Sequence, residues 1–115
     1  QVGAPTPAAW IADATTRIVA QGVPASGIWN LVAAGATSWH GFAEAIMEDA
    51  LAAGLLERRP RVLPITTADY PTPARRPAYS VLDTAKLRSD FGIAPPDWRD
   101  GLRAVLGDIA ATRIP

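Results

Sequence analysis

The amino-acid sequence predicts a single, mostly helical α+β domain with two or three short strands. Two observations lead to this prediction: apolar residues recur at helical spacing in several windows, and the strand-forming runs between those windows are short. The chain has 115 residues, 49% of them hydrophobic, which is enough to build one core. Because so few short strands cannot form a stable sheet by themselves, we expect them to join or pack against a neighbouring domain.

The first helix is predicted from about Pro7 to Ala20. Thr6 is the expected N-cap, and Pro7 suits the first helical position because an N–H there would have no helical partner. Gly22 and Pro24 should end this helix. The second helix should begin at Ser38 and end at Gly54. A short third helix should begin at Asp83 or Thr84 and end at Gly92, and Asp97 should cap the start of the last helix.

Three runs have strand character. Gly27–Val32 is rich in β-branched and aromatic side chains and is bounded by turn residues. Val62–Thr66 fits only the edge of a sheet, because Pro64 lacks the N–H that a central strand donates. Tyr79–Leu82 is a third short extended run, whereas residues 33–37 are predicted to form a loop of small side chains.

A proline-rich segment, Asp69–Asp83, carries two adjacent arginines. Proline fixes φ and pushes the preceding residue toward extended geometry, so this segment cannot be helical. It should hold Arg75 and Arg76 in defined directions, and paired guanidinium groups suit a phosphate or diphosphate. The alternative is a surface loop with solvated arginines, which is the commoner arrangement.

The composition argues against several functional classes. Eleven acidic and eleven basic residues balance, so nothing favours nucleic acid as a partner. The chain contains no cysteine, which excludes disulfides and thiolate chemistry and fits a reducing compartment, so we expect a cytoplasmic location. No apolar run has the length of a membrane span or the form of a secretory signal.

Residues that usually perform catalysis are scarce. The one histidine, His40, should be a polar surface residue at a helix start, and Glu44, Glu48 and Asp49 should form a solvated helix face rather than a metal site. The sequence has no glycine-rich phosphate loop, and neither tyrosine is followed four residues later by lysine. The chain by itself should therefore not bind a nicotinamide cofactor. Among the four tryptophans, Trp39 is the best candidate to stack on a ligand ring, and the other three should serve in packing.

Four segments, in this order and spacing, resemble one known family. They are Gln1–Thr6, Gly35–Ala43, the proline-rich segment with its Pro-Thr-Pro-Ala-Arg-Arg-Pro run, and Phe91–Leu102. Together they are similar to the C-terminal third of the dTDP-4-dehydrorhamnose reductase family, in the extended short-chain dehydrogenase/reductase superfamily. The resemblance implies an α/β enzyme of Rossmann type, with residues 1–115 as its substrate-binding domain and its N-terminal Rossmann domain missing from this sequence.

The resemblance also implies a reaction. Members of the family reduce the 4-keto group of dTDP-6-deoxy-L-lyxo-4-hexulose with NADPH, which gives dTDP-L-rhamnose for cell-surface polysaccharide. A Tyr, assisted by a Lys and a Thr, supplies the proton. Because these groups and the NADPH site belong to the Rossmann domain, we expect this chain alone to be inactive and to supply contacts to the dTDP-sugar.

The family's substrate contacts can be carried over to eight positions. Arg75 or Arg76 should contact the diphosphate, and the segment Gly3–Thr6 should line the cleft beside the sugar nucleotide. Trp39 and Ser80 are weaker candidates. The implied substrate-binding set is Gly3, Ala4, Pro5, Thr6, Trp39, Arg75, Arg76 and Ser80.

Some members of the family form a homodimer around Mg²⁺ held by carboxylates. Here Ala9 stands at the first of these positions and Asp108 at the second, so we assign no metal residues and leave a homodimer open. Two other interpretations also stay open. The chain could be a non-catalytic binding or regulatory module of the superfamily, or part of a related sugar-nucleotide reductase or epimerase acting on another deoxysugar.

Overall fold

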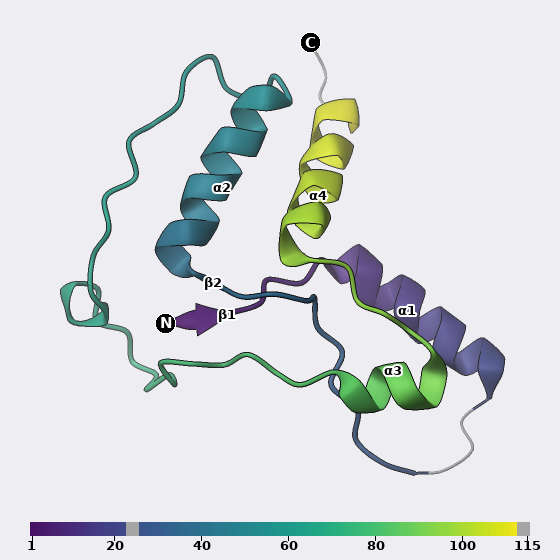
Figure 1. Cartoon of the computed structure of the whole chain (residues 1–115). Helices are drawn as coiled ribbons and strands as arrows, with labels where there is room; N and C mark the ends of the chain where they lie inside the picture. Colours follow the sequence, from purple (N-terminus) through teal and green to yellow (C-terminus); the bar gives the residue numbers. More distant parts are fainter. Residues whose placement is uncertain (23–25, 113–115) are drawn as a thin grey trace.

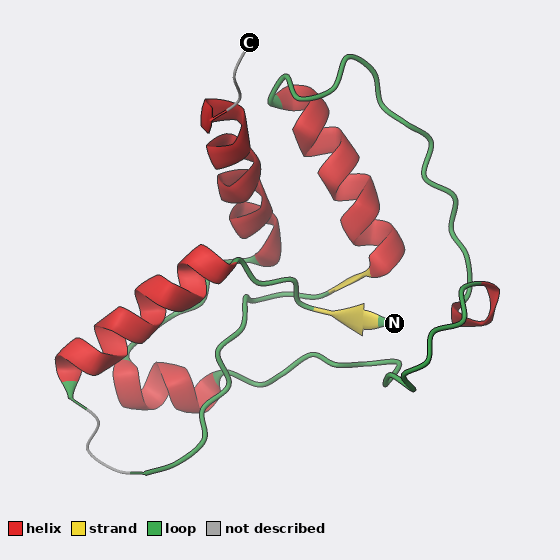
Figure 2. Cartoon of the chain, turned by 180° about the vertical axis from the view of Figure 1, so that it is seen from behind, coloured by secondary structure: helices red, strands yellow, loops and turns green. Residues whose placement is uncertain are grey.

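The chain folds into two helix pairs with a short β-ribbon between them. The structure, a computed structural model, describes residues 1–22 and 26–112. Helices α2 (Trp39–Ala52) and α4 (Trp98–Thr112) lie side by side, and α1 (Ala8–Gln21) lies next to the short α3 (Ala85–Phe91) (Figure 1). Strands β1 (Val2–Gly3) and β2 (Thr37–Ser38) form the antiparallel ribbon, which Figure 2 shows from behind. The predicted mostly helical fold class is confirmed.

Each helix pair has a small core of its own. Ala45 and Ala50 of α2 pack against Leu102 and Leu106 of α4, and all four are at most 8% exposed. Small alanine side chains at this contact let the two helices approach closely. The second core consists of Leu87, Phe91 and Ile93, with Trp10, Ile18, Trp29 and Leu31 packed against it. Since Trp98 packs on the first core, three tryptophans serve in packing, as predicted.

The β-ribbon brings together three parts of the chain that are distant in sequence. Val2 lies opposite Ser38 across the two strands. On the other side of β1, the Val2 N–H donates to the Ala78 carbonyl, and the Ser80 N–H donates to the Val2 carbonyl, each at 2.8 Å. The proline-rich segment is thereby fixed beside β1.

Thr6 is not the N-cap of α1, so this prediction is wrong. Pro7 occupies the cap position with extended backbone angles, and the helix begins at Ala8. The Thr6 hydroxyl instead donates to the Ala4 carbonyl and accepts from the Ala33 N–H, both at 3.0 Å. A partner 27 residues away thus occupies the hydroxyl that a local cap would need.

The other helix ends follow the predicted signals closely. The Ser38 hydroxyl accepts from the Gly41 N–H at 3.0 Å and so caps α2, which ends at Ala52, two residues before Gly54. Further confirmed signals are Gly22 and Gly92 at the ends of α1 and α3, and Asp83 and Asp97 at the starts of α3 and α4. Pro24 lies outside the described residues. No helix within the described ranges is long and apolar enough to cross a bilayer.

The predicted strand positions are mostly wrong. Gly27–Val32 runs as an irregular segment whose Trp29 packs on the second core, and Val62–Thr66 is a mostly exposed stretch without regular secondary structure. Tyr79–Leu82 contributes only a single bridge between Tyr79 and Val2. The second strand of the ribbon forms instead at residues 37–38, partly inside the expected loop. Local side-chain character could not identify these strands, because their partners are distant in sequence.

Candidate functional site

A hollow of about 300 Å³ lies where β1, β2, the start of α2 and the proline-rich segment meet. We call it the β1 cavity. Six of the eight predicted substrate-binding residues line it: Gly3, Ala4, Pro5, Trp39, Arg76 and Ser80. Thr6 and Arg75 do not. None of the described residues around the cavity is Asp, Glu, His, Lys, Cys or Tyr, so its walls offer binding groups rather than a proton donor.

The floor of the β1 cavity depends on Gly3, because glycine has no side chain. A Cβ at this position would lie 2.8 Å from Ser80 Oγ, closer than carbon atoms of this type approach a neighbour. Without it, the proline-rich segment sits directly on β1, and the Ser80 hydroxyl donates to the Val2 carbonyl at 3.2 Å. The close approach that glycine permits here is therefore to the chain's own Ser80.

Trp39 presents its indole ring at the rim of the β1 cavity. It is the first residue of α2 and is 68% exposed, and its Nε1 donates to Gln1 Oε1 at 3.0 Å. The ring centroid of Phe42 lies 6.2 Å from that of Trp39 and 6.2 Å from that of Trp98 on α4. The α2–α4 pair thus braces the Trp39 ring, while most of its surface stays available to a ligand.

A second hollow of about 400 Å³ adjoins the first. We call it the η1 pocket, because the 3₁₀ turn η1 (Thr67–Asp69) forms part of its wall. The two hollows share Gln1, Ser38, Trp39 and Arg76. His40 and Tyr70 line only the second one. His40 was expected at the surface but is half-buried, and its Nδ1 is buried without a hydrogen-bond partner among the described residues.

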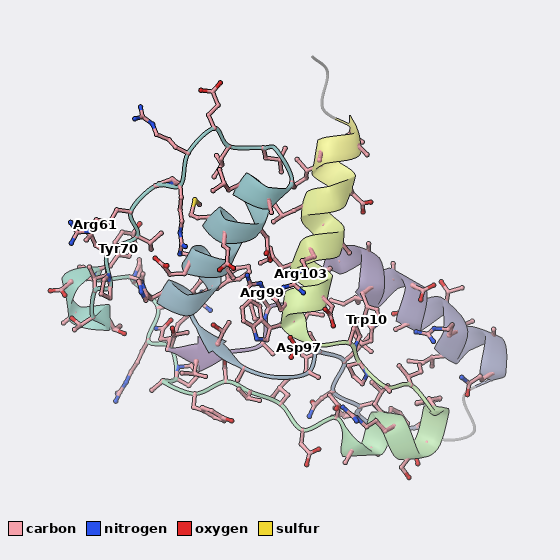
Figure 3. The ribbon with its side chains drawn as sticks, turned by 45° about the horizontal axis from the view of Figure 1, so that its top comes forward. Trp10, Arg61, Tyr70, Asp97, Arg99 and Arg103 are labelled. Atoms are coloured by element: carbon pink, nitrogen blue, oxygen red, sulfur yellow. The ribbon has the colours of Figure 1, made fainter. Side chains whose placement is uncertain are left out.

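Sequence reasoning did not single out Tyr70 as a site residue. It is 69% exposed and lies beside the η1 turn in Figure 3. The signal that could have identified it is its position directly before Pro71, within the segment already selected for its arginines. A residue before proline is held in extended geometry, which gives its side chain a defined direction.

The η1 turn is fixed by a reciprocal cap. The Thr66 N–H and hydroxyl both donate to Asp69 Oδ2 at 2.9 Å, and the Asp69 N–H donates to Thr66 Oγ1 at 3.3 Å. These hydrogen bonds from Thr66 stabilise the carboxylate and hold the pKa of Asp69 below its ordinary value. One wall of the η1 pocket is therefore locally ordered, although it belongs to an exposed segment.

The fold separates the two adjacent arginines. Arg76 lines both hollows, whereas Arg75 lines neither. Neither side chain forms an ion pair with a carboxylate in the part of the chain that the structure describes. A guanidinium group without a carboxylate partner at the wall of a cavity can bind a phosphate through charge-assisted hydrogen bonds. Of the two candidates that the sequence left open, the geometry favours Arg76.

The acidic residues of α2 all form ion pairs. The prediction of a solvated face holds for Glu48, whose side chain is 60% exposed, and is wrong for Asp49. Asp49, with its side chain 11% exposed, accepts from Arg99 Nε at 2.7 Å and from Nη2 at 3.1 Å, and Figure 3 shows Arg99 at the start of α4. The hydrogen bond from Arg99 holds the pKa of Asp49 below its usual range and raises the pKa of Arg99. Glu44 pairs with Arg59, and Glu48 with Arg99 at 3.4 Å.

No group of three or more His, Cys, Asp or Glu side chains in the described ranges is placed to hold a metal ion. The assignment of no metal residues stays a prediction. The ion pairs of α2 join it to α4 and to the segment that follows it, so their role in this structure is to hold the scaffold behind the two hollows.

Comparison with known proteins places the chain in a family. The model of the RmlD substrate binding domain matches residues 1–111. A dTDP-4-dehydrorhamnose reductase of Shigella flexneri is 38% identical over 97% of this chain, and one of Burkholderia thailandensis is 42% identical over 95%. A Streptomyces antibioticus protein described as a probable dTDP-4,6-dihydroxy-2-methyloxan-3-one 4-ketoreductase is 39% identical over the whole chain.

These relatives are much longer than the chain. It spans 38% of the Shigella protein, 40% of the Burkholderia protein and 37% of the Streptomyces protein. The resemblance inferred from the four sequence segments is thus confirmed by the family match and by the names of the relatives. The chain belongs to the family of RmlD substrate binding domains.

Proposed function

We propose that this chain is the substrate-binding part of an NADPH-dependent dTDP-4-dehydrorhamnose reductase. Its β1 cavity takes the diphosphate and sugar of dTDP-6-deoxy-L-lyxo-4-hexulose. The observation that carries the proposal is the position of Arg76: an arginine with no carboxylate partner among the described residues lines the same hollow as Gly3, Trp39 and Ser80. The names of the relatives support the choice of ligand.

The chain's own residues bind and orient the substrate in this proposal. Arg76 holds the diphosphate, Ser80 offers a hydroxyl to the sugar, and Trp39 covers a ring and excludes water from the cavity. The nicotinamide cofactor supplies the hydride and is held by a Rossmann domain preceding residue 1, together with the Tyr and Lys that provide the proton. Residues 1–115 alone are therefore inactive. The complete enzyme works in the cytoplasm, with a second copy of itself as a further partner.

The two adjacent arginines provide a matched test. Arg76→Ala should weaken binding of the dTDP-sugar about tenfold or more, because a charge-assisted hydrogen bond contributes about 1.5–3 kcal/mol. Arg75→Ala removes the same charge from the neighbouring residue, which lines neither hollow. The dissociation constant of this variant should therefore stay within about twofold of the wild-type value. Isothermal titration calorimetry with dTDP and with a dTDP-sugar measures both. Equal effects of the two substitutions would contradict the proposal.

A related ketoreductase for another deoxysugar is the second candidate. The Streptomyces relative, whose name gives a different dTDP-linked sugar, is 39% identical, against 38% for the Shigella reductase, so identity alone does not separate the two. The rate of nicotinamide oxidation with each keto-sugar decides between them in the complete enzyme. If the sequence before residue 1 lacks the glycine-rich fingerprint and the Tyr/Lys pair, the chain is instead a non-catalytic module.

A further inference from the structure

The indole of Trp39 is hydrogen-bonded to a residue outside the predicted substrate-binding set. Its Nε1 donates to the side-chain oxygen Oε1 of Gln1 at 3.0 Å. Gln1 and Trp39 both line the β1 cavity and the η1 pocket. The function proposed above uses Trp39 to cover a ring of the substrate and gives Gln1 no role.

The β-ribbon brings these two side chains together from distant parts of the sequence. Strands β1 and β2 are antiparallel, with Val2 opposite Ser38. This register, continued by one residue, puts Gln1 opposite Trp39, at the point where β2 leads into α2. Figure 1 shows the N-terminal end of β1 below the start of α2. Opposite residues of an antiparallel pair are close enough for side-chain contact, so the ribbon places the Gln1 amide within reach of the indole.

Two contacts from different elements fix the direction of the Trp39 ring. Gln1 holds the N–H edge of the indole from the ribbon. Phe42, one turn further along α2, lies against the ring with the two centroids 6.2 Å apart and the ring planes at 52°. Because Trp39 is 68% exposed, it lacks the surrounding packing that selects one rotamer in a protein core. These two contacts therefore determine where the ring points.

Stability alone does not account for the hydrogen bond between Gln1 and Trp39. An exposed indole N–H can donate to water, so exchanging water for the Gln1 oxygen contributes little to the free energy of unfolding. The bond does define the orientation of the ring before a ligand arrives. A side chain that is already ordered loses less conformational entropy on binding, which strengthens the affinity.

We propose that Gln1 is a positioning residue for the substrate, because it holds the Trp39 ring in the direction in which that ring covers the dTDP-sugar. This inference rests on the proposed function, in which Trp39 contacts the substrate. It goes further by giving Gln1 a role, which Gln1 performs through Trp39 and not through a contact of its own with the ligand.

The test compares the only two glutamines of the chain, in the complete enzyme. Gln21 also forms a side-chain hydrogen bond, from its Nε2 to the Phe91 carbonyl at 3.1 Å, but it lines neither hollow. Gln1→Met removes the acceptor and should raise the KM for the dTDP-sugar about threefold to tenfold, with kcat within about twofold, because uniform binding is lost. Gln21→Met should change neither constant by more than about twofold. Circular dichroism verifies that each variant is folded.

A double-mutant cycle shows whether Gln1 acts through Trp39. Trp39→Phe keeps an aromatic ring but removes the N–H that Gln1 holds, so this variant should itself raise the KM. In that background, Gln1→Met should change the KM by less than about twofold, since no N–H remains to be oriented. If Gln1→Met raises the KM equally in both backgrounds, Gln1 acts by another route and the positioning role is wrong.

The hydrogen bond can also be observed without a ligand. In ¹⁵N–¹H NMR spectra, the indole cross-peak of Trp39 is the one that Trp39→Phe lacks. Gln1→Met should shift this cross-peak, and Gln21→Met should leave it in place. An unshifted cross-peak in Gln1→Met would contradict the contact between Gln1 and the indole.

The possible outcomes separate this inference from the proposed function. If Arg76→Ala weakens binding of the dTDP-sugar but Gln1→Met behaves like Gln21→Met, the proposed function stands and the positioning role is overturned. If the complete enzyme does not bind the dTDP-sugar, both proposals fall.

Discussion

The α2–α4 pair and the segment between α2 and α3 differ in how far their large side chains are buried. In the pair, Leu102 and Leu106 are each 8% exposed, and Arg99 donates two hydrogen bonds to Asp49. In the segment, Leu63 is 63% exposed and Tyr70 is 69% exposed. The pair runs as two parallel neighbours in Figure 1, whereas the segment traces a long arc along the outer side of α2 and then runs below the ribbon to α3.

The difference shows how the chain divides stability from binding. The pair supplies the buried apolar surface that stabilises this half of the molecule, and it braces Trp39 through Phe42. The segment supplies Arg76 and Tyr70, and it is tied to the rest of the molecule by the Glu44–Arg59 ion pair and by the hydrogen bonds of Val2. Ligand contacts on a loop positioned by a packed scaffold are a common arrangement in binding proteins.

The largest expected effect on the free energy of unfolding comes from truncating a buried leucine of the α2–α4 pair, with an exposed leucine of the segment as the control. Leu102→Ala removes a side chain from the α2–α4 core and should lower the free energy of unfolding by about 2–5 kcal/mol. Leu63→Ala makes the same chemical change on the exposed segment and should alter it by less than about 0.5 kcal/mol. Urea unfolding followed by circular dichroism measures both. Similar losses for the two variants would show that the segment is packed more tightly than the structure indicates.

A smaller effect is expected from breaking the ion pair between the helices. Arg99→Ala leaves the carboxylate of Asp49 largely enclosed without its bidentate partner and should cost about 1–3 kcal/mol of unfolding free energy. Arg17→Ala breaks the exposed pair with Asp13, at 3.4 Å on α1, and serves as the control, with an expected cost below about 0.5 kcal/mol. Thermal unfolding distinguishes the two. If Arg99→Ala lowers the free energy of unfolding no more than the control does, the Arg99–Asp49 pair does not stabilise the fold.

The smallest effect concerns the junction where the two regions meet the ribbon. Gly3→Ala places a Cβ 2.8 Å from Ser80 Oγ and should cost about 1 kcal/mol, because the proline-rich segment must move away from β1. Ser80→Gly in the same chain removes the obstructing hydroxyl and should restore most of the loss. Urea unfolding of the single and double variants gives the coupling energy. If the two substitutions are simply additive, the Ser80 hydroxyl is not the group that a Cβ at position 3 displaces.

Signals that act within a few residues were sufficient for the helices. Ser38 and Asp97 cap their helices with their own side chains, and Gly22 and Gly92 end theirs with positive φ. Each of these depends on groups within about one helical turn, so the sequence contains all the information needed. The proline-rich segment was predicted as non-helical for the same local reason.

The remaining features depend on residues that are distant in sequence. Thr6 could cap a helix by its chemistry, but the Ala33 N–H, 27 positions away, takes its hydroxyl. Val2 forms a strand only because Ser38 and Ala78 lie beside it. Arg75 and Arg76 are equivalent in the sequence, and only the fold turns one of them to the two hollows. The sequence by itself determined the helices and their ends because those hydrogen bonds are local, whereas the ribbon and the site were decided by tertiary structure, since they need three separate segments to meet.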